Sequence, residues 1–216
     1  MKKWLSYLFP ISIKTLESPV NGRLEINWVN GKKVLDTAHS NYSYGTLQQI
    51  LKKGLKAIRF EPKTNEILVL GMGVGSILET LRKDFHSKAR VDLVELDSLI
   101  IHLAQTEFGI DQYQPFKIFE EDAFAYLQTS KKSYELIVVD LFIGNEVPLK
   151  FCSPEFILLL NEHLVLGGKI IFNTMAETMP KPMLNELQGA FLALNLSSHI
   201  IAGVAYSNNL LIIEKG

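Results

Sequence analysis

One stretch of the sequence, residues 66–76, constrains the fold more than any other. It reads Glu-Ile-Leu-Val-Leu-Gly-Met-Gly-Val-Gly-Ser, so a short apolar run is followed by Gly71, Gly73 and Gly75. Such a run is typical of a strand that is buried on both faces of a parallel sheet. The glycines allow the backbone to approach a ligand, and a helical pattern that begins at Ser76 offers free N–H groups. The stretch predicts a nucleotide-binding turn, and the alternative is a tight turn without a ligand.

Composition and charge narrow the possible functions. The 216 residues suffice for one domain, or for one domain with a small appendage. The net charge is −1, so no strong general field attracts nucleic acid or an anionic membrane, and we expect neither as a partner. We interpret the basic cluster of Lys52, Lys53, Lys56 and Arg59 as a solvated helix face.

The first ten residues and the single cysteine bear on the location of the protein. Residues 1–10 hold two lysines and an apolar segment that is shorter than the core of a signal peptide. No stretch reaches the roughly 18 apolar residues that a membrane span needs. Cys152 is the only cysteine, which excludes a disulfide within the chain and fits a reducing compartment. We expect a cytoplasmic protein with a structural thiol.

The hydrophobic pattern divides the chain into two regions. Residues 11–16 and 23–29 alternate between apolar and polar side chains, and Asn30-Gly31 marks a tight turn before a third short segment. We interpret residues 1–43 as a small antiparallel β-hairpin layer that could cap a pocket or form a dimer contact. Residues 44–216 are expected to form an α/β domain, which starts with a helical pattern.

Strands and helices alternate along this second region. Strand patterns occur at 67–70, 91–96, 116–119, 136–139 and 169–173, and helical patterns at 76–86, 98–108, 123–128, 154–164 and 181–194. The alternation predicts a doubly wound parallel sheet, and we expect Gly167-Gly168 to form a turn before the strand at 169–173. The last two strands, 198–204 and 209–214, have no helix between them and must pair antiparallel. A mostly parallel seven-stranded sheet closed by an antiparallel C-terminal hairpin resembles the fold of S-adenosylmethionine-dependent methyltransferases.

Carboxylates follow the predicted strands, at the edge where ligands bind in open parallel sheets. Glu95 ends the second strand, where a carboxylate can accept hydrogen bonds from both ribose hydroxyls. Asp122 could accept a bond from an adenine amino group while the N–H of Ala123 meets a ring nitrogen. Asp140 would lie at the reacting end, where it can balance a sulfonium cation or take a proton from an amine. Asp122 could equally be a helix N-cap, and for Asp97 we prefer that role.

Other chemistries have little support in the sequence. The five histidines show no ligand spacing with cysteines or acids, so we predict no metal site. Ser76 lies outside any Gly-x-Ser-x-Gly motif, which argues against a hydrolase, and the chain has no P-loop motif. Ser76 also replaces the third glycine of the dinucleotide fingerprint, which makes an NAD-dependent dehydrogenase a weaker alternative.

Four segments together resemble the spermidine synthase family, which is a branch of the methyltransferase fold. They are residues 67–76, 91–97, 121–123 and 134–140, and residues 22–38 are similar to the family's N-terminal hairpin layer. The resemblance implies that the chain binds S-adenosylmethionine or its decarboxylated form and that it forms a homodimer. It assigns the cofactor to Gly71, Gly73, Gly75, Glu95, Asp122 and Ala123, and the catalytic roles to Asp140 and Tyr44.

The sequence departs from the family where a polyamine would bind. Val74 stands where the family has an aspartate that grips the amine chain, and Ile143 replaces a second aspartate in the loop after Asp140. Only the tyrosine of a Tyr-His-Glu stretch is kept, in Tyr44-Gly45-Thr46. A desolvated polyamine needs paired carboxylates, so these replacements oppose a polyamine acceptor. The loop that starts at Asp140 resembles instead the spermidine-synthase-like proteins of bacteria.

The favoured hypothesis is a transferase that moves a methyl or aminopropyl group from S-adenosylmethionine, or from its decarboxylated form, to a small-molecule acceptor that could be an amine. A polyamine aminopropyltransferase is the second hypothesis. The third is a nucleotide-binding relative that has lost catalysis.

Overall fold

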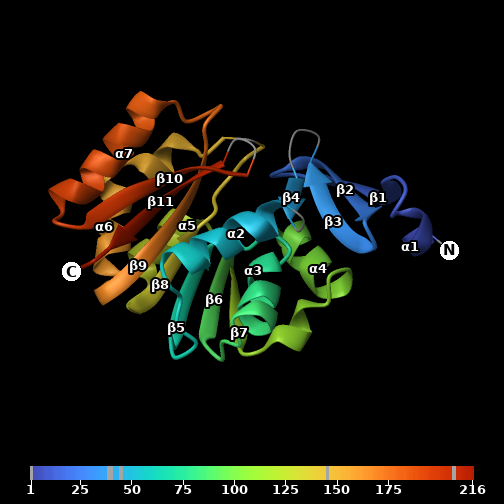
Figure 1. Cartoon of the computed structure of the whole chain (residues 1–216), viewed down its shortest axis with the longest axis horizontal. Coiled ribbons are helices and arrows are strands. Elements are labelled where there is room, and N and C mark those ends of the chain that lie inside the picture. The colour runs from blue at the N-terminus through green and yellow to red at the C-terminus, as the bar shows by residue number, and fades with distance from the viewer. Residues whose placement is uncertain (1, 38–40, 44–45, 145, 206–207) are drawn as a thin grey trace.

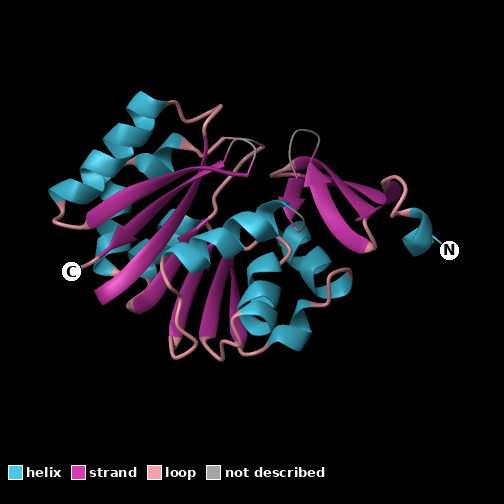
Figure 2. Cartoon of the chain, viewed as in Figure 1, coloured by secondary structure: helices cyan, strands magenta, loops and turns pink. Residues whose placement is uncertain are grey.

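The structure, a computed structural model, describes residues 2–37, 41–43, 46–144, 146–205 and 208–216. It contains a seven-stranded sheet and a separate four-stranded antiparallel sheet near the N-terminus (Figure 1). Helices cover the larger sheet, and one of them, α2, crosses between the two sheets (Figure 2). The predicted α/β architecture with a small N-terminal β layer is confirmed.

The larger sheet has the strand order β10-β11-β9-β8-β5-β6-β7. Its strands β5 to β9 are parallel, and β11 pairs antiparallel with both β9 and β10, as predicted for the C-terminal hairpin. The chain runs outward in opposite directions from β5 and β8, so the switch point of the topology lies between these two strands. The strands are β5 (Glu66–Leu70), β6 (Arg90–Glu95), β7 (Phe116–Glu120), β8 (Tyr134–Val139), β9 (Leu164–Met175), β10 (Ser197–Ala205) and β11 (Asn208–Glu214).

Both faces of this sheet are covered, and its central strands β5 and β8 are apolar from Ile67 to Leu70 and from Leu136 to Val139. Alternate residues of a strand point to opposite faces. Ile67 and Val69 of β5 belong to the core under α2, α3 and α4, whereas Leu68 and Leu70 belong to the core under α5, α6 and α7. The helices are α2 (Thr46–Ala57), α3 (Ser76–Glu79), α4 (Ser98–Thr106), α5 (Ala123–Thr129), α6 (Pro154–Glu162) and α7 (Lys181–Ala193), with a π-helical turn η1 (Thr80–Asp84) and the 3₁₀ turns η2 (Ile110–Tyr113) and η3 (Leu149–Cys152).

The N-terminal sheet is larger than the predicted hairpin layer by one short strand. Its strands, in spatial order, are β1 (Ile11–Ser18), β2 (Gly22–Val29), β3 (Lys32–Thr37) and β4 (Asn41–Ser43), and a single helical turn, α1 (Lys2–Leu5), precedes them. Leu24, Ile26 and Leu35 are fully buried and join the core on the α2 side of the larger sheet. This continuity of the core fixes the layer against the rest of the chain. The division of the chain at residue 43 stays a prediction.

Turns were expected at two glycine-containing dipeptides, and the structure confirms only the first of them. Asn30 and Gly31 both have positive φ, 49° and 75°, as a two-residue hairpin of this type requires, so that turn is confirmed. Gly167-Gly168, expected as a turn before a strand, lies instead within β9, which already begins at Leu164. Gly167 has φ 76°, and the pairing of β8 with β9 shifts register in this region, so the glycines accommodate an irregularity inside the strand. Of the helices in the described residues, none is long and apolar enough to cross a membrane.

Candidate functional site

The glycine turn holds the ends of β5 and β8 in close contact. Gly71 has φ 83°, and a Cβ atom at this position would lie 2.2 Å from the carbonyl oxygen of Asp140. The Asp140 N–H donates to the carbonyl of Leu70 at 2.8 Å, which continues the pairing of the two strands. Gly75 is similarly restricted, because a Cβ there would lie 2.6 Å from Ile110 Cγ2. Two of the three predicted glycines are therefore required by close packing as well as by their positive φ.

A cavity lies at the carboxyl ends of β5, β6, β7 and β8. Five of the predicted site residues line it together: Gly71, Glu95, Asp122, Ala123 and Asp140. The other lining residues come from the β1–β2 turn, the ends of the strands, the loop after β8 and η3, and they are Val20, Asn21, Val94, Leu96, Glu121, Leu141, Phe142, Ile143, Pro148, Lys150 and Phe151. Of the remaining predicted residues, Gly73 reaches the site through its N–H group, whereas Tyr44 lies outside the described residues.

Glu95 is a buried carboxylate that is held by backbone N–H groups. It is only 6% exposed, and its two carboxylate oxygens accept hydrogen bonds from the N–H of Gly73 at 3.2 Å and of Asp97 at 3.1 Å. Burial raises the pKa of Glu95 to about 7, although these N–H groups act in the opposite direction. The glycine turn and the end of β6 thus orient one carboxylate toward the cavity, where further donors would stabilise its charge.

Asp122 fills one of the two roles expected from the sequence, that of a helix N-cap, and its adenine-binding role stays a prediction. Its Oδ1 caps α5 by accepting from the N–H groups of Phe124 and Ala125, at 2.9 and 3.3 Å. Its Oδ2 accepts a bond from Lys150 Nζ at 2.6 Å. Partial burial raises the pKa of Asp122, but the bonds from Lys150 and from the N–H groups outweigh burial and lower it below its usual value. Lys150 is a site residue that the sequence did not reveal, because a single lysine in a loop carries no recognisable pattern.

Asp140 lies at the end of β8 and is held by a chain of two amide side chains. Asn173 Nδ2 donates to Asp140 Oδ1 at 2.8 Å, and Asn208 Nδ2 donates to Asn173 Oδ1 at 3.1 Å. Burial raises the pKa of Asp140 to about 6, and the bond from Asn173 opposes this rise. Neither asparagine was predicted. They come from β9 and from β11, so only the pairing of these strands brings them to the carboxylate.

The N-terminal sheet contributes to the cavity through the β1–β2 turn. Asn21 Nδ2 donates to Asp97 Oδ2 at 2.7 Å, and the hydroxyl of Ser18 donates to the same oxygen. Asp97 also caps α4 by accepting from the N–H of Leu99 at 2.9 Å, so the predicted cap is confirmed. Asn21 Oδ1 is buried and has no hydrogen-bond partner among the described residues, and Asn21 lines the cavity. A ligand donor at this position would satisfy that oxygen.

The structure places three further side chains that the sequence analysis discussed, and they are Val74, Ile143 and Cys152. Val74 is fully buried within the core on the α2 side and does not line this cavity, so our expectation that it makes the acceptor end of the site apolar is not supported. Ile143 does line the cavity and is 52% exposed. Burial raises the pKa of Cys152 to about 11, which fits the expected structural thiol. In the described part of the chain, no three His, Cys, Asp or Glu side chains are grouped to hold a metal ion.

The fold and the cavity define a protein of the methyltransferase-like α/β class. A seven-stranded sheet with an antiparallel closing hairpin carries a glycine turn and carboxylates at its switch point. Residues 54–191 match the model of the spermine/spermidine synthase domain. The chain belongs to the spermine/spermidine synthase family.

Several of the proteins that are similar to this chain in sequence are polyamine aminopropyltransferases from bacteria. The chain is 28% identical over 160 residues to a probable polyamine aminopropyl transferase of Bifidobacterium longum, which covers 69% of this chain and 34% of the relative. It is 26% identical over 125 residues to a polyamine aminopropyltransferase of Vibrio vulnificus, which covers 56% of this chain and 42% of the relative. The matches thus span less than half the length of these curated relatives.

Solved structures share the fold over most of the chain. A probable spermidine synthase from Corynebacterium glutamicum superposes with a TM-score of 0.72 at 18% identity, over 94% of this chain and 79% of that one. A spermidine synthase in complex with the transition-state analogue AdoDATO gives 0.67 at 17% identity, over 95% and 74%. Human methyltransferase-like protein 13 in complex with SAH gives 0.61 at 19% identity, over 79% of each chain.

Proposed function

We propose that this protein is a transferase that binds S-adenosylmethionine or its decarboxylated form and transfers a group from it to a small-molecule acceptor. The observation that carries the proposal is that Glu95, Asp122 and Asp140, predicted from three separate strand ends, line one cavity beside Gly71. Family membership supports the same cofactor class. The homodimer and the cytoplasmic location predicted from the sequence stay predictions.

The residues present fit the adenosyl part of this cofactor. Glu95 would accept hydrogen bonds from the ribose hydroxyls. Burial raises the pKa of Glu95 to about 7, and hydrogen bonds donated to its carboxylate would stabilise the charged form. Asp122 and the N–H of Ala123 would bind the adenine edge. The unpartnered Asn21 Oδ1 would accept one further donor from the ligand. When bound, the sulfonium cofactor supplies an electrophilic carbon, and the protein needs to position the acceptor in line with it.

Asp140 is the residue we assign to the acceptor. With a pKa of about 6 it is mostly ionised at neutral pH, so it can hold an ammonium group or receive the proton that an attacking amine must lose. The amide of Asn173 fixes the orientation of this carboxylate. To hold the ammonium group or to receive the proton, Asp140 requires only that the amine reach one of its two carboxylate oxygens.

Calorimetry with four ligands tests the proposal. We expect S-adenosylmethionine, its decarboxylated form or methylthioadenosine to bind, and NADH to bind at least tenfold more weakly. Glu95→Ala should weaken adenosyl binding tenfold or more, because the ribose loses charge-assisted hydrogen bonds worth about 1.5–3 kcal/mol. Glu162→Ala, on an exposed side chain of α6, is the matched control. No binding of any of the three adenosyl ligands to the folded protein would refute the proposal.

Aminopropyl transfer to an amine is the second candidate. The aminopropyltransferase relatives and the position of Asp140 favour it. At the Asp140 end of the described cavity, however, the neighbouring side chains Leu141, Phe142 and Ile143 are apolar. An assay with decarboxylated S-adenosylmethionine and putrescine, in which methylthioadenosine is detected, tests this reaction. Turnover that is abolished in Asp140→Asn supports it. No product at high enzyme concentration, with the cofactor shown to bind, removes it.

A further inference from the structure

The first segment of the chain presents apolar side chains to solvent. Five residues between positions 4 and 9 are exposed, and they are Trp4 (80%), Leu5 (41%), Tyr7 (59%), Leu8 (79%) and Phe9 (56%). Ser6, the polar residue among them, is only 2% exposed. This arrangement is the reverse of that in a folded surface segment, where the polar side chain would face water. A patch of this kind marks an interaction site.

Contacts with the β2–β3 turn fix this orientation. The Ser6 carbonyl accepts a bond from the N–H of Asn30 at 2.9 Å, and Ser6 Oγ accepts one from the N–H of Gly31 at 3.0 Å. The ring of Tyr7 packs over the same turn, since a Cβ on Gly31 would lie 2.2 Å from the Tyr7 hydroxyl oxygen. Ser6 is therefore the anchor of the segment, and the large apolar side chains on either side of it are directed outward.

Positive charge accompanies this patch. Residues 1–37 contain six basic residues, Lys2, Lys3, Lys14, Arg23, Lys32 and Lys33, against three acidic ones, whereas the rest of the chain has more acidic than basic residues. Lys14 and Lys33 share an ion pair with Glu107, and Arg23 pairs with Glu25, so the charge that we assign to the patch is that of Lys2, Lys3 and Lys32. The net charge of −1 for the whole chain conceals this asymmetry. Aromatic and leucine side chains beside lysines are the composition of segments that lie in the interface of an anionic bilayer.

We propose that the N-terminal end of the molecule docks on the surface of an anionic lipid bilayer, with Trp4, Leu5, Leu8 and Phe9 inserted at the level of the headgroups. Tyr7 would remain on the β2–β3 turn. The proposal departs from the expectation, drawn from the net charge, that no membrane is a partner. It is independent of the reaction proposed for the cavity.

The alternative occupant of the patch is a second copy of the chain. A two-fold interface at this end would bring two identical basic surfaces together, and the cores of protein interfaces are depleted in lysine. An anionic surface instead complements the charge, and lysines close to such a surface are attracted to it. The charge therefore favours lipid over a second copy.

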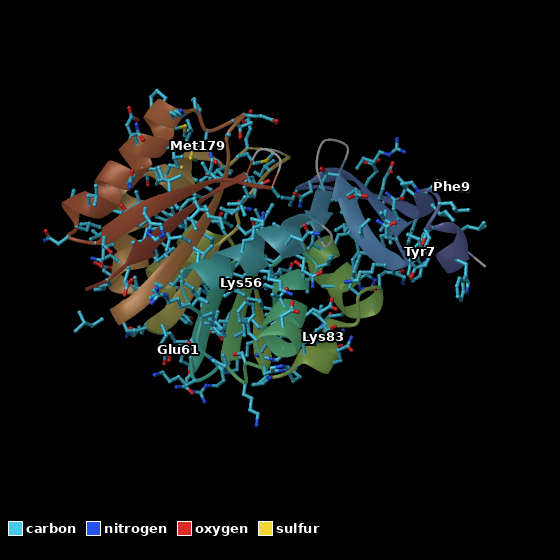
Figure 3. The ribbon with its side chains drawn as sticks, viewed as in Figure 1. Tyr7, Phe9, Lys56, Glu61, Lys83 and Met179 are labelled. Atoms are coloured by element: carbon cyan, nitrogen blue, oxygen red, sulfur yellow. The ribbon has the colours of Figure 1, made fainter. Side chains whose placement is uncertain are left out.

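Docking at this end leaves the cavity accessible. Figure 3 shows Tyr7 and Phe9 at one extreme of the long axis of the molecule, beyond the small sheet. The segment adjoins the start of β1 at Ile11, whereas the cavity receives Val20 and Asn21 from the turn after its other end, Ser18. The seven steps along β1 from Ile11 to Ser18 separate the two by about 23 Å at 3.3 Å per residue.

Vesicle co-sedimentation tests the proposal. We expect the protein to bind vesicles of phosphatidylcholine with 30% phosphatidylglycerol at least tenfold more tightly than vesicles of phosphatidylcholine alone, and less tightly as salt rises from about 0.05 to 0.3 M. The double variant Trp4→Ser/Leu8→Asn should lose at least tenfold of this binding. Leu166→Asn, at an equally exposed leucine (78%) in β9, should bind as the wild type does.

Fluorescence locates the inserted side chain. The chain has two tryptophans, so Trp28→Phe leaves Trp4 as the only one, and its emission should shift to the blue with anionic vesicles. Circular dichroism verifies that each variant is folded, and Leu166→Asn controls for the loss of an exposed leucine elsewhere on the surface. The proposal is overturned by equal binding to both vesicle types, by a double variant that binds like the wild type, or by a dimer that depends on Trp4 and Leu8 in a protein that does not bind vesicles.

Discussion

At the scale of single residues, the positions of the acidic site residues follow from the sequence but their properties do not. Glu95, Asp122 and Asp140 each end or follow an apolar run, and the parallel sheet brings such ends together. Burial raises the pKa of Asp140 and the bond from Asn173 of β9 opposes this rise, and a local sequence pattern contains neither effect. Lys150 and Asn21 were missed for the same reason: each lies in a short turn between strands and helices, and only the fold gives it a partner.

Asp140 should make the stability of the ligand-free protein depend on pH. Its pKa is raised from 3.8 to about 6, so between these values the native state binds a proton that the unfolded chain has lost. The contribution of Asp140 to the free energy of unfolding therefore falls as pH rises from about 4 to about 6. Asp140→Asn removes this loss, and its stability relative to the wild type should increase over that range by at most about 3 kcal/mol.

Urea unfolding at pH 4, 5, 6, 7 and 8 measures this difference. Glu95 also has a raised pKa, but it is present in both proteins and cancels. Asp111→Asn, on an exposed side chain, is the matched control and should show no such trend. A difference between Asp140→Asn and the wild type that stays constant over this pH range would contradict the assignment.

At the scale of elements, strands and helices were predictable where the hydrophobic period was clear. Every strand of the seven-stranded sheet was expected within a few residues, because apolar runs and turn residues delimit them. The strand β4 and the single turn α1 were missed, since three or four residues are too few to show a period. The bulge in β9 at Gly167 was misread as a turn, because a glycine pair has the same appearance in both settings.

The glycine turn should tolerate no side chain at its first position. Gly71→Ala would combine a φ of 83° with a Cβ 2.2 Å from the Asp140 carbonyl oxygen. We expect it to lower the free energy of unfolding by about 3 kcal/mol or more. Gly189→Ala is the matched control, because this glycine lies in α7 with open space around it. Alanine there should stabilise the protein by about 0.5–1 kcal/mol, and equal effects of the two variants on thermal unfolding would refute the argument.

At the scale of the whole molecule, the cavity depends on both sheets. The family model covers residues 54–191, whereas Val20 and Asn21 lie well before that range. Asp97 connects the two parts, because one of its oxygens accepts bonds from Ser18 and Asn21 while the other caps α4. Local sequence patterns cannot predict a contact between segments as distant as Asp97 and the β1–β2 turn. They predicted only that the hairpin layer could cap a pocket.

Asp97→Asn should therefore affect stability and ligand binding together. The amide nitrogen that replaces one oxygen cannot accept from Ser18 or Asn21, and a buried network that loses an acceptor costs about 1–3 kcal/mol. Methylthioadenosine should also bind several-fold more weakly, since Asn21 lines the cavity. Urea unfolding and calorimetry measure the two effects. Loss of stability with unchanged affinity would show that the β1–β2 turn does not take part in binding.

The contact between Gly71 and Asp140 has a consequence for how such a site changes during evolution. Because backbone touches backbone there, the nucleotide turn and the acidic side chain form one rigid unit that tolerates almost no substitution. Four residues of the segment that follows, Leu141, Phe142, Ile143 and Pro148, also line the cavity, and Ile143 is exposed. For the transferase that we propose, we therefore expect substitutions at these positions to change the choice of acceptor while the turn that holds the cofactor stays intact.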